Sequence, residues 1–260
     1  MFVKHIPALV LLLSMAGPLK AQHKVLMEFG LLGDWPQGEF AQNQTFPGLG
    51  MQGQILFRIH PALPILKMGP RIGYSWYGSK YQETSRTFPV YNGDFLVGEL
   101  QADVGLRTRS TAMDYQWNLR LEAENTAFTP YVQVGFGFRT FQTRTKITDE
   151  TDEPVFSDPE NRELKVITHN RDWIGTLSAG LGFRFKVANQ IYVNFSTDYF
   201  YGGRIDFYNT SQNSQWQVQF TGNNWDPNNI NSEDIEITGN PIRSDSNLLR
   251  FNLGICIGIN

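Results

Sequence analysis

Apolar and polar residues alternate one by one along most of this chain, and this pattern restricts its possible folds more than any other feature. In Leu249–Asn260 every odd position is apolar, and the even positions are Arg, Asn, Gly, Cys, Gly and Asn. A helix would spread these two sets around its surface, whereas a β-strand places them on opposite faces. The pattern therefore predicts an all-β protein with one apolar and one polar face on each strand.

The alternation recurs in seven further segments: Val25–Leu31, Met51–Ile59, Leu66–Trp76, Met113–Glu122, Val132–Arg139, Leu177–Lys186 and Ile191–Tyr201. Leu26 and Leu56 do not fit it, because they fall on the polar side. Together with the last segment this makes eight strands, the smallest number typical of a bacterial membrane β-barrel.

Connection lengths favour a membrane barrel over a soluble sandwich, because short and long links take turns. The short links are His60–Pro64, Ala123–Pro130 and Ala188–Gln190. The long, polar links are Gly33–Pro47, Ser79–Ser110, Thr145–Asn170 and Gly203–Asn247. Short periplasmic turns and long extracellular loops are typical of such barrels. We therefore expect a transmembrane antiparallel up-and-down β-barrel.

One segment leaves the strand number open. Phe95–Arg107 also alternates, and counting it as a spanning strand would require a partner within Lys80–Tyr91 and give ten strands. We favour eight strands, with this segment as a hairpin extension above the membrane, and keep ten as the alternative.

Glycines and aromatic residues have consistent places in this pattern. Many glycines fall on the polar face, where small residues leave room for long charged side chains in a narrow lumen: Gly69, Gly73, Gly135, Gly137, Gly180, Gly182, Gly254 and Gly258. An aromatic girdle is expected near the outer end: Trp76, Tyr115, Trp117, Trp173, Tyr199 and Tyr201. Tyr131 and Phe185 are candidates for the inner interface.

The N-terminus has the layout of a secretory signal peptide. Lys4 and His5 precede the apolar run Ile6–Met15, which is too short to span a bilayer, and Ala21 precedes the expected cleavage site. We expect residues 1–21 to be the signal peptide and residues 22–260 to be the outer-membrane barrel domain. Cys256 cannot form an internal disulfide, because it is the single cysteine, and is expected to fill the barrel interior.

The segments Lys20–Gln22, Lys67–Tyr74 and Thr129–Phe138 resemble small outer-membrane β-barrels of the outer membrane protein A type. The likeness is greatest to the eight-stranded members from Bacteroidota-type bacteria. It covers essentially the whole mature chain and implies the barrel and its place in the outer membrane of a Gram-negative bacterium, but no activity.

The polar face carries a set of charges expected to meet in the lumen: Glu28, Arg58, Lys67, Arg71, Asp114, Arg120, Glu122, Arg139, Arg184, Lys186, Asp198 and Arg250. An eight-stranded barrel is just wide enough to be filled by side chains. Buried charges must be paired, so the favoured interpretation is a salt-bridged plug. The alternative is a cationic lumen that passes or holds an anion.

Signals for enzymatic or metal chemistry are weak. His169 is the one rim histidine, with Asp172 and Ser178 nearby, but no nucleophile signature surrounds Ser178. The acidic tract Asp226–Asp234 has oxygen ligands, but its spacing does not match a calcium loop. We expect no catalytic residues, no metal and no cofactor.

The last long loop has the strongest signal for a partner. Trp216, Phe220 and Trp225 lie in a polar, Asn-rich segment, where they could either dock a protein or glycan or be covered by other loops. A net charge of −3 argues against a nucleic-acid partner.

The expected function is therefore a non-enzymatic barrel with a structural, scaffold or binding role through its outer loops. The alternatives are a narrow anion-permeable channel and a lipid-modifying enzyme. Outer-membrane lipid and lipopolysaccharide are the expected surroundings.

Overall fold

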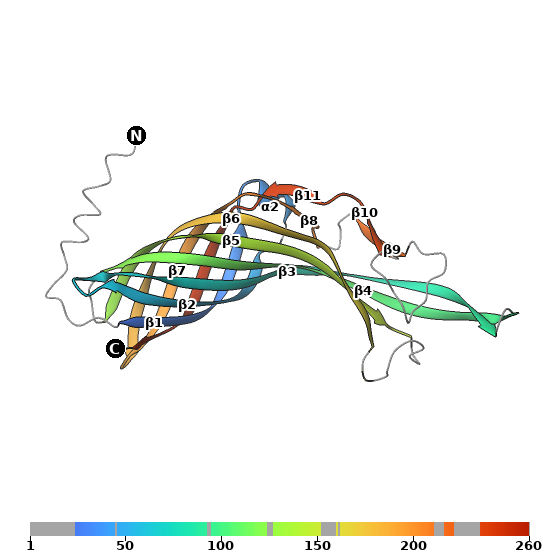
Figure 1. Cartoon of the computed structure of the whole chain (residues 1–260), viewed down its shortest axis with the longest axis horizontal. Coiled ribbons are helices and arrows are strands. Elements are labelled where there is room, and N and C mark those ends of the chain that lie inside the picture. The colour runs from blue at the N-terminus through green and yellow to red at the C-terminus, as the bar shows by residue number, and fades with distance from the viewer. Residues whose placement is uncertain are drawn as a thin grey trace.

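The computed structural model shows one elongated β-barrel whose wall continues on one side as a long sheet (Figure 1). It describes residues 24–44, 46–92, 95–123, 127–151, 160, 162–210, 216–220 and 235–259. The expected signal peptide, residues 1–21, lies outside this part. Among the described residues, no helix is long and apolar enough to cross a membrane.

Eight antiparallel strands close the barrel, so the expectation of eight strands is confirmed. They are β1 (Val25–Pro36), β2 (Gly48–His60), β3 (Leu63–Asn92), β4 (Phe95–Glu122), β5 (Phe128–Asp149), β6 (Glu163–Ala188), β7 (Ile191–Gly202) and β12 (Leu248–Ile259). Each pairs with its neighbour in sequence order, and β1 closes the ring against β12. Closure of the ring leaves no sheet edge in the barrel wall, and unpaired backbone N–H and C=O groups at such an edge would be costly in lipid.

The remaining elements lie where β7 leads over to β12 and where β1 leads over to β2. They are the short helix α2 (Glu39–Asn43) and the strand pairs β8 (Arg204–Phe207) with β11 (Ile242–Asp245) and β9 (Gln217–Phe220) with β10 (Ile235–Thr238). Figure 1 places all of them away from the chain termini.

The two faces of each strand separate as the alternation predicts. On β12, Leu253, Ile255 and Ile257 are exposed on the outside, whereas Arg250 and Cys256 are buried inside. The same holds around the ring, and the result is an apolar outer surface around a polar interior. This distribution, apolar outside and polar inside, is the reverse of that in a soluble protein and suits a barrel whose outer surface faces lipid.

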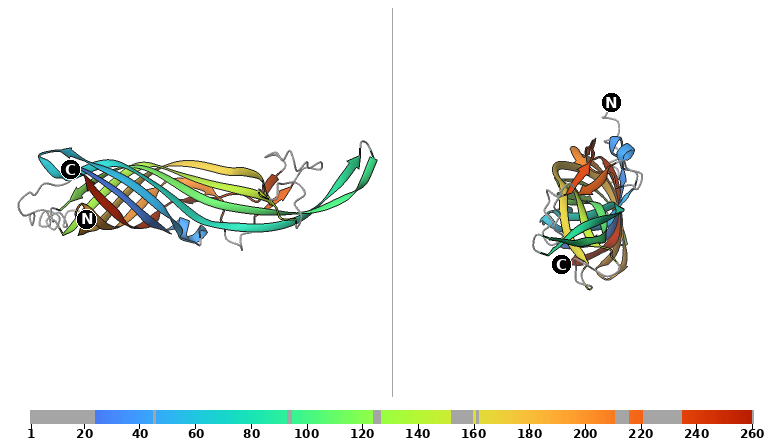
Figure 2. Two further views of the ribbon diagram at one scale, coloured as in Figure 1. Left: turned by 90° about the horizontal axis from the view of Figure 1, so that it is seen from below. Right: turned by 90° about the vertical axis from the view of Figure 1, so that its right-hand side faces the viewer.

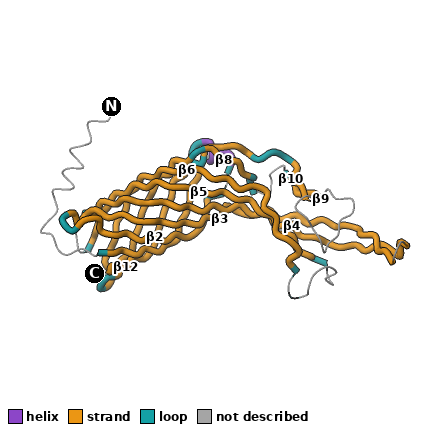
Figure 3. The backbone as a smooth tube through the Cα atoms, viewed as in Figure 1, coloured by secondary structure: helices purple, strands orange, loops and turns teal. Residues whose placement is uncertain are grey.

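The barrel has two different ends. At the short-turn end lie the start of β1, the end of β12 and the tight turns at residues 61–62 and 189–190. The β4–β5 connection is at the same end. At the opposite, long-loop end lie α2 and the short strands β8 to β11 (Figure 3). This matches the arrangement of short periplasmic turns and long external loops.

Four strands continue past the barrel at the long-loop end. We call this region the sheet extension: β3 from Ser79, β4 up to Arg109, β5 from Thr143 and β6 up to Asn170. The β4–β5 pairing ends at Val104–Asp149, but β3 and β4 remain paired to Asn92–Phe95. This outermost two-stranded ribbon, Ser85–Asn92 with Phe95–Asp103, is the arm, and it projects far from the barrel (Figure 2).

Three expected loop boundaries are therefore wrong. β1 reaches Pro36, so Gly33–Pro47 is not all loop, and Ser79–Ser110 is paired strand for nearly all its length. β5 and β6 likewise extend into Thr145–Asn170. The polarity of these segments indicated loops, but a polar segment remains a strand where a neighbour satisfies its backbone groups. The hairpin expected within residues 80–107 is present.

Candidate functional site

The lumen near the long-loop end is closed by a carboxylate network that crosses the seam of the barrel. Asp34 of β1 accepts two hydrogen bonds from Arg250 of β12, Nε to Oδ1 at 2.5 Å and Nη2 to Oδ2 at 2.8 Å. Arg250 also donates to Asp114 on β4 at 2.6 Å, and Asp114 accepts from Arg139 on β5 at 2.5 Å. The Tyr77 hydroxyl also donates to Asp34 Oδ2, at 2.9 Å. Both carboxylates are thus held by several donors, as buried charges require.

The middle of the lumen is filled from opposite walls. Arg71 of β3 reaches Asp198 of β7 at 3.1 Å, and Gln133 donates to the other oxygen of that carboxylate at 2.7 Å. Phe200, fully buried, lies under three guanidinium groups, with Arg71, Arg139 and Arg250 centred 4.5–5.1 Å from its ring centroid. An aromatic ring among cations adds cation–π attraction while occupying the space that water would need.

Glu122 is the centre of the network nearer the short-turn end. Lys67 and Arg184 both pair with its Oε2, the latter at 2.7 Å, and Arg120 lies 3.7 Å from Oε1. Arg120 also forms a two-pronged pair with Glu28 at 2.5 and 2.8 Å. Glu122 of β4 thereby joins β3 and β6 inside the barrel.

Apolar side chains seal the short-turn end. Leu26, Leu56, Tyr192 and Cys256 form a buried cluster inside the barrel. Leu26 and Leu56 are therefore not irregularities of strand geometry, because they point inward at polar-face positions and close the lumen. Cys256 is buried, as expected.

The long-loop end is capped in the same way. Phe40 of α2 enters the barrel mouth, and its ring centroid lies 5.3–5.9 Å from those of Tyr77, Phe141 and Phe207. Ala112, Ile174 and Ile205 complete this buried cluster. The charge network of the lumen thus lies between two buried apolar clusters, one toward each end of the barrel.

The structure brings most of the expected lumen charges together and adds one. Eleven charged side chains are buried in the barrel and each takes part in an ion pair: Glu28, Asp34, Lys67, Arg71, Asp114, Arg120, Glu122, Arg139, Arg184, Asp198 and Arg250. Asp34 is absent from the expected set because it falls within the segment Gly33–Pro47, which was expected to be a long polar link. Continuing the period of two from Glu28 would have found it.

Two of the expected lumen residues lie elsewhere. Lys186 is exposed, because it lies two residues before the end of β6, at the rim. Arg58 is half-buried near the end of β2, where the pairing with β3 becomes irregular. Both fall on the polar face of the alternation, but the filled part of the lumen ends before it reaches them.

Trp216, expected as either a docking or a covered residue, is covered. It packs inside the sheet extension with Val104, Leu106, Ile147 and others. The indole N–H of Trp216 donates to the Asn209 carbonyl at 2.6 Å. Lys80 Nζ donates to the backbone carbonyl of Trp216 at 2.7 Å and lies 4.6 Å from the centroid of the indole ring. This pair fastens the last loop to β3. The side chain of Phe220 and the whole of Trp225 lie outside the described residues.

His169 belongs to the same inner surface. Its Nε2 lies 2.7 Å from Thr145 Oγ1, which lies 2.6 Å from Thr108 Oγ1 on the next strand. Burial lowers the pKa of His169 to about 4, since no acidic partner offsets the cost of desolvating its charged form. Burial likewise lowers the pKa of Lys80. The interior of the extension therefore disfavours added positive charge.

The structure separates the three residues considered for catalysis. His169 and Ser178 are nine positions apart on β6, or roughly 30 Å along a strand. Ser178 lies in the lumen, 3.2 Å from Arg71 Nη2, while Asp172 accepts from the Asp206 backbone N–H at 2.7 Å. They do not form a catalytic set.

The six expected girdle residues are all exposed on the outside: Trp76, Tyr115, Trp117, Trp173, Tyr199 and Tyr201. Tyr115 and Trp173 stack with ring centroids 6.4 Å apart. Trp35 of β1 is also exposed, and both it and Tyr199 pair with Leu249 of β12, so it extends the set. The inner-interface expectation is wrong for Tyr131, which points into the lumen, where Arg120 lies 3.9 Å from its ring centroid.

A closed barrel with an apolar outer surface, paired charges inside and loops at one end is the structure with which proteins span bacterial outer membranes. The protein is accordingly an outer-membrane β-barrel. The described residues place a network of paired charges inside the barrel and an extended sheet at its long-loop end.

No protein-family model matches the sequence, and no curated protein matches it either. Among solved structures, Neisserial surface protein A aligns with a TM-score of 0.41 and 7% identity, covering 92% of this chain and all of that one. Ail of Yersinia pestis, in complex with the heparin analogue sucrose octasulfate, aligns at 0.36 and 9% identity, covering 92% of this chain and 99% of its own. A major outer membrane protein from Thermus thermophilus aligns at 0.38 and 12%, covering 90% and 99%. At this level of similarity none of them assigns a function to the chain.

Proposed function

We propose that this outer-membrane barrel is a non-enzymatic binding protein whose sheet extension engages an extended segment of a protein partner outside the cell. The observation that carries the proposal is the arm, in which β3 and β4 stay paired long after the rest of the wall has ended. The filled barrel is then the anchor that holds this sheet above the membrane.

The edges of the arm are the binding feature. Beyond the Val104–Asp149 pair, β4 has β3 as its one strand neighbour among the described residues, and from Ser79 onward β3 likewise pairs with β4 alone. At Asp103 the N–H and C=O on that side already bond to Thr151 Oγ1 and to the Glu150 N–H, but farther out no other described strand pairs with either strand. A strand edge of this kind is the template for adding a strand from another chain. A two-stranded ribbon is only marginally stable in water, so an added strand would also stabilise it.

The lumen argues for binding over conduction. Its charges are paired with one another, and apolar clusters lie at both ends. We expect a reconstituted barrel to give no conductance steps in a planar bilayer. Anion-selective steps would instead support the channel alternative.

A shortened arm tests the proposal. Replacing residues 86–102 by Asn-Gly would join Ser85 to Asp103, which already face each other, through a two-residue hairpin turn. We expect this variant to fold and insert as the wild type does but to lose proteins cross-linked to the extension on intact cells. Undiminished cross-linking of the same partners by a correctly folded variant would show that the arm is not the binding surface.

Membership of the Bacteroidota-type, outer membrane protein A-like barrels is part of the same proposal, and rests on the sequence segments described above. Lipid and lipopolysaccharide are the proposed neighbours of the apolar outer surface, because exposing so much apolar surface to water would be unfavourable.

A further inference from the structure

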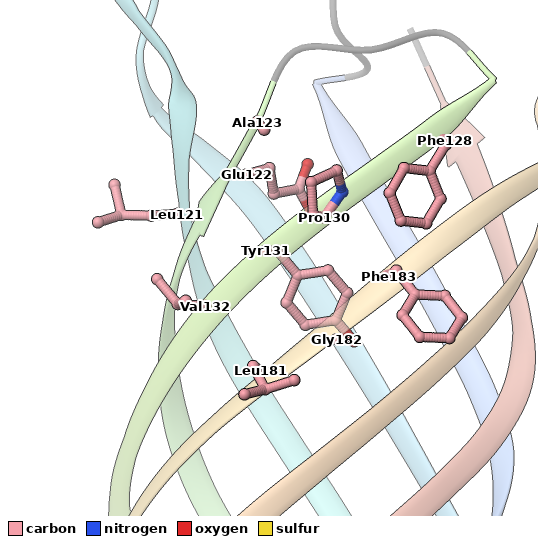
Figure 4. Close-up of a pocket in the computed structure, with 10 residues that line it drawn as sticks. All are labelled: Leu121, Glu122, Ala123, Phe128, Pro130, Tyr131, Val132, Leu181, Gly182 and Phe183. Carbon is pink, nitrogen blue, oxygen red and sulfur yellow. The ribbon is translucent and has the colours of Figure 1, made fainter. Parts of the chain in front are cut away.

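The lipid-facing wall is hollowed over β5, near the short-turn end (Figure 4). The hollow, here called the β5 groove, has a volume of about 340 Å³, within the range of small-ligand sites. Its lining is almost entirely apolar: Leu121, Glu122, Ala123, Phe128, Pro130, Tyr131, Val132, Leu181, Gly182 and Phe183. Glu122 and Tyr131 belong to it through the strand that carries them, because their side chains are buried in the lumen.

The shape of the groove follows from the sizes of neighbouring side chains. Val132 on β5 pairs with Leu121 of β4 on one side and with Leu181 of β6 on the other. Pro130, the next outward residue of β5, pairs with Phe183 of β6. The hollow lies over the small residues Pro130 and Gly182, between side chains that project farther from the wall. Figure 4 shows Leu121 and Val132 on one side and Phe128 and Phe183 on the other.

One wall of the groove is stiffened by packed rings. Phe183 lies 5.2 Å from Phe185, 5.3 Å from Phe195 and 5.8 Å from Phe128, measured between ring centroids. Rings held by several neighbours keep their positions, so the groove is formed before anything enters it.

The groove lies in the apolar outer surface of the barrel, where the surrounding molecules are membrane lipids. Val132 and Leu181 remain 42% and 58% exposed, in line with Val134 and Leu177 farther along the same strands. An acyl chain is flexible, unbranched and apolar, and it matches a trough of this lining. We propose that the β5 groove is a specific site for one acyl chain of a phospholipid in the leaflet at the short-turn end.

The preference comes from fit and not from the hydrophobic effect. Lipid tails are already in an apolar medium and gain nothing by leaving water. A chain in the groove contacts atoms on three sides, whereas a chain on the convex wall contacts atoms on one side, and the difference is dispersion energy summed over many atom pairs. The site should therefore enrich one lipid without binding it irreversibly.

Photo-labelling of the full chain tests the site. The protein is reconstituted in vesicles of phosphatidylethanolamine that carries a photoreactive diazirine in its acyl chain, and labelled residues are mapped by mass spectrometry. We expect Leu121, Leu181 and Phe183 to be labelled about threefold or more above Ile257 and Ile259, which face lipid on β12, because of the extra contacts. Equal labelling around the barrel would overturn the proposal.

Variants that fill the groove are the second part of the test. Val132→Trp places a large ring in the groove and should reduce labelling of Leu181 and Phe183 to the level of Ile259. Ile257→Trp introduces the same ring on β12, three strands away from β5 in the ring, and should leave the groove labelled. Val132→Leu is the milder filling if the tryptophan variant does not insert. Unchanged labelling in an inserted Val132 variant would contradict the site. The groove is far from the arm, so its failure would leave the proposed function untouched.

Discussion

Asp34 and Arg250 face each other across the seam where the first strand of the barrel meets the last, and the guanidinium holds the carboxylate with two hydrogen bonds. The pair is fully buried and joins residues 216 positions apart in the sequence. It therefore forms only when the ring closes, and it ties closure to the network that fills the lumen.

Removing one partner of this seam pair should destabilise the barrel strongly. Asp34→Asn leaves Arg250 with a buried charge that Asp114 alone must offset, and we expect a loss of about 3 kcal/mol in the free energy of unfolding. Urea unfolding of the reconstituted barrel, followed by gel mobility, measures it. Asp245→Asn is the matched control, because its pair with Arg204 is exposed and should contribute less than about 1 kcal/mol. Equal losses of unfolding free energy in the two variants would show that the buried seam pair contributes no more than an exposed ion pair.

Gly182 should tolerate no side chain, although it lies in a regular strand. A Cβ at this position would overlap both the Tyr131 ring inside the lumen and the backbone oxygen of Phe195, and we expect Gly182→Ala to cost about 1–3 kcal/mol of unfolding free energy. Gly175→Ala on the same strand is the control, since nothing lies within 4 Å of its added Cβ. An unchanged unfolding free energy in Gly182→Ala would contradict this prediction, since both Tyr131 and the Phe195 backbone would have to shift without cost.

Acid should loosen the sheet extension through His169. The folded state takes up its proton only near pH 4, whereas the unfolded chain does so near 6.5, so the unfolded state binds more protons between these values. The stability of the extension therefore falls as pH drops from 6.5 toward 4. Hydrogen exchange of β5 and β6 measures this, and His169→Gln should flatten the dependence over that window. Protection factors of the wild-type extension that stay constant over this range, after correction for the intrinsic pH dependence of amide exchange, would contradict the assignment.

Trp216 should hold the last loop against the extension. Trp216→Ala removes the largest ring of the apolar cluster around Val104 and Leu106, and we expect local opening of the extension to become easier by about 3 kcal/mol. Tryptic cleavage within the extension, in proteoliposomes, reports this opening. Trp173→Ala removes an indole of the same size from the lipid side, where it is 55% exposed, and should leave cleavage unchanged. Similar cleavage of both variants would argue against a covered Trp216.

Alternation determined the strands and the face of each residue, and the connection lengths then favoured a barrel over a sandwich. The pleat is a local property, so Arg71, Asp114 and Arg250 could be assigned to the lumen without knowing their partners. The same rule applied strictly places Leu26 and Leu56 inside, where they are found. Their apolar character, which contradicted a polar lumen, is explained by the seal they form.

Tertiary structure decided everything that depends on register and on where a strand stops. Asp34 became part of the network only because β1 continues to pair with β12, and Lys186 was lost from it because the lumen ends first. The burial of Trp216 depends on residues from β4, β5 and β6 that converge on it beyond the barrel. Such contacts join positions far apart in the chain, and the pairing that brings them together is not a property of any single segment.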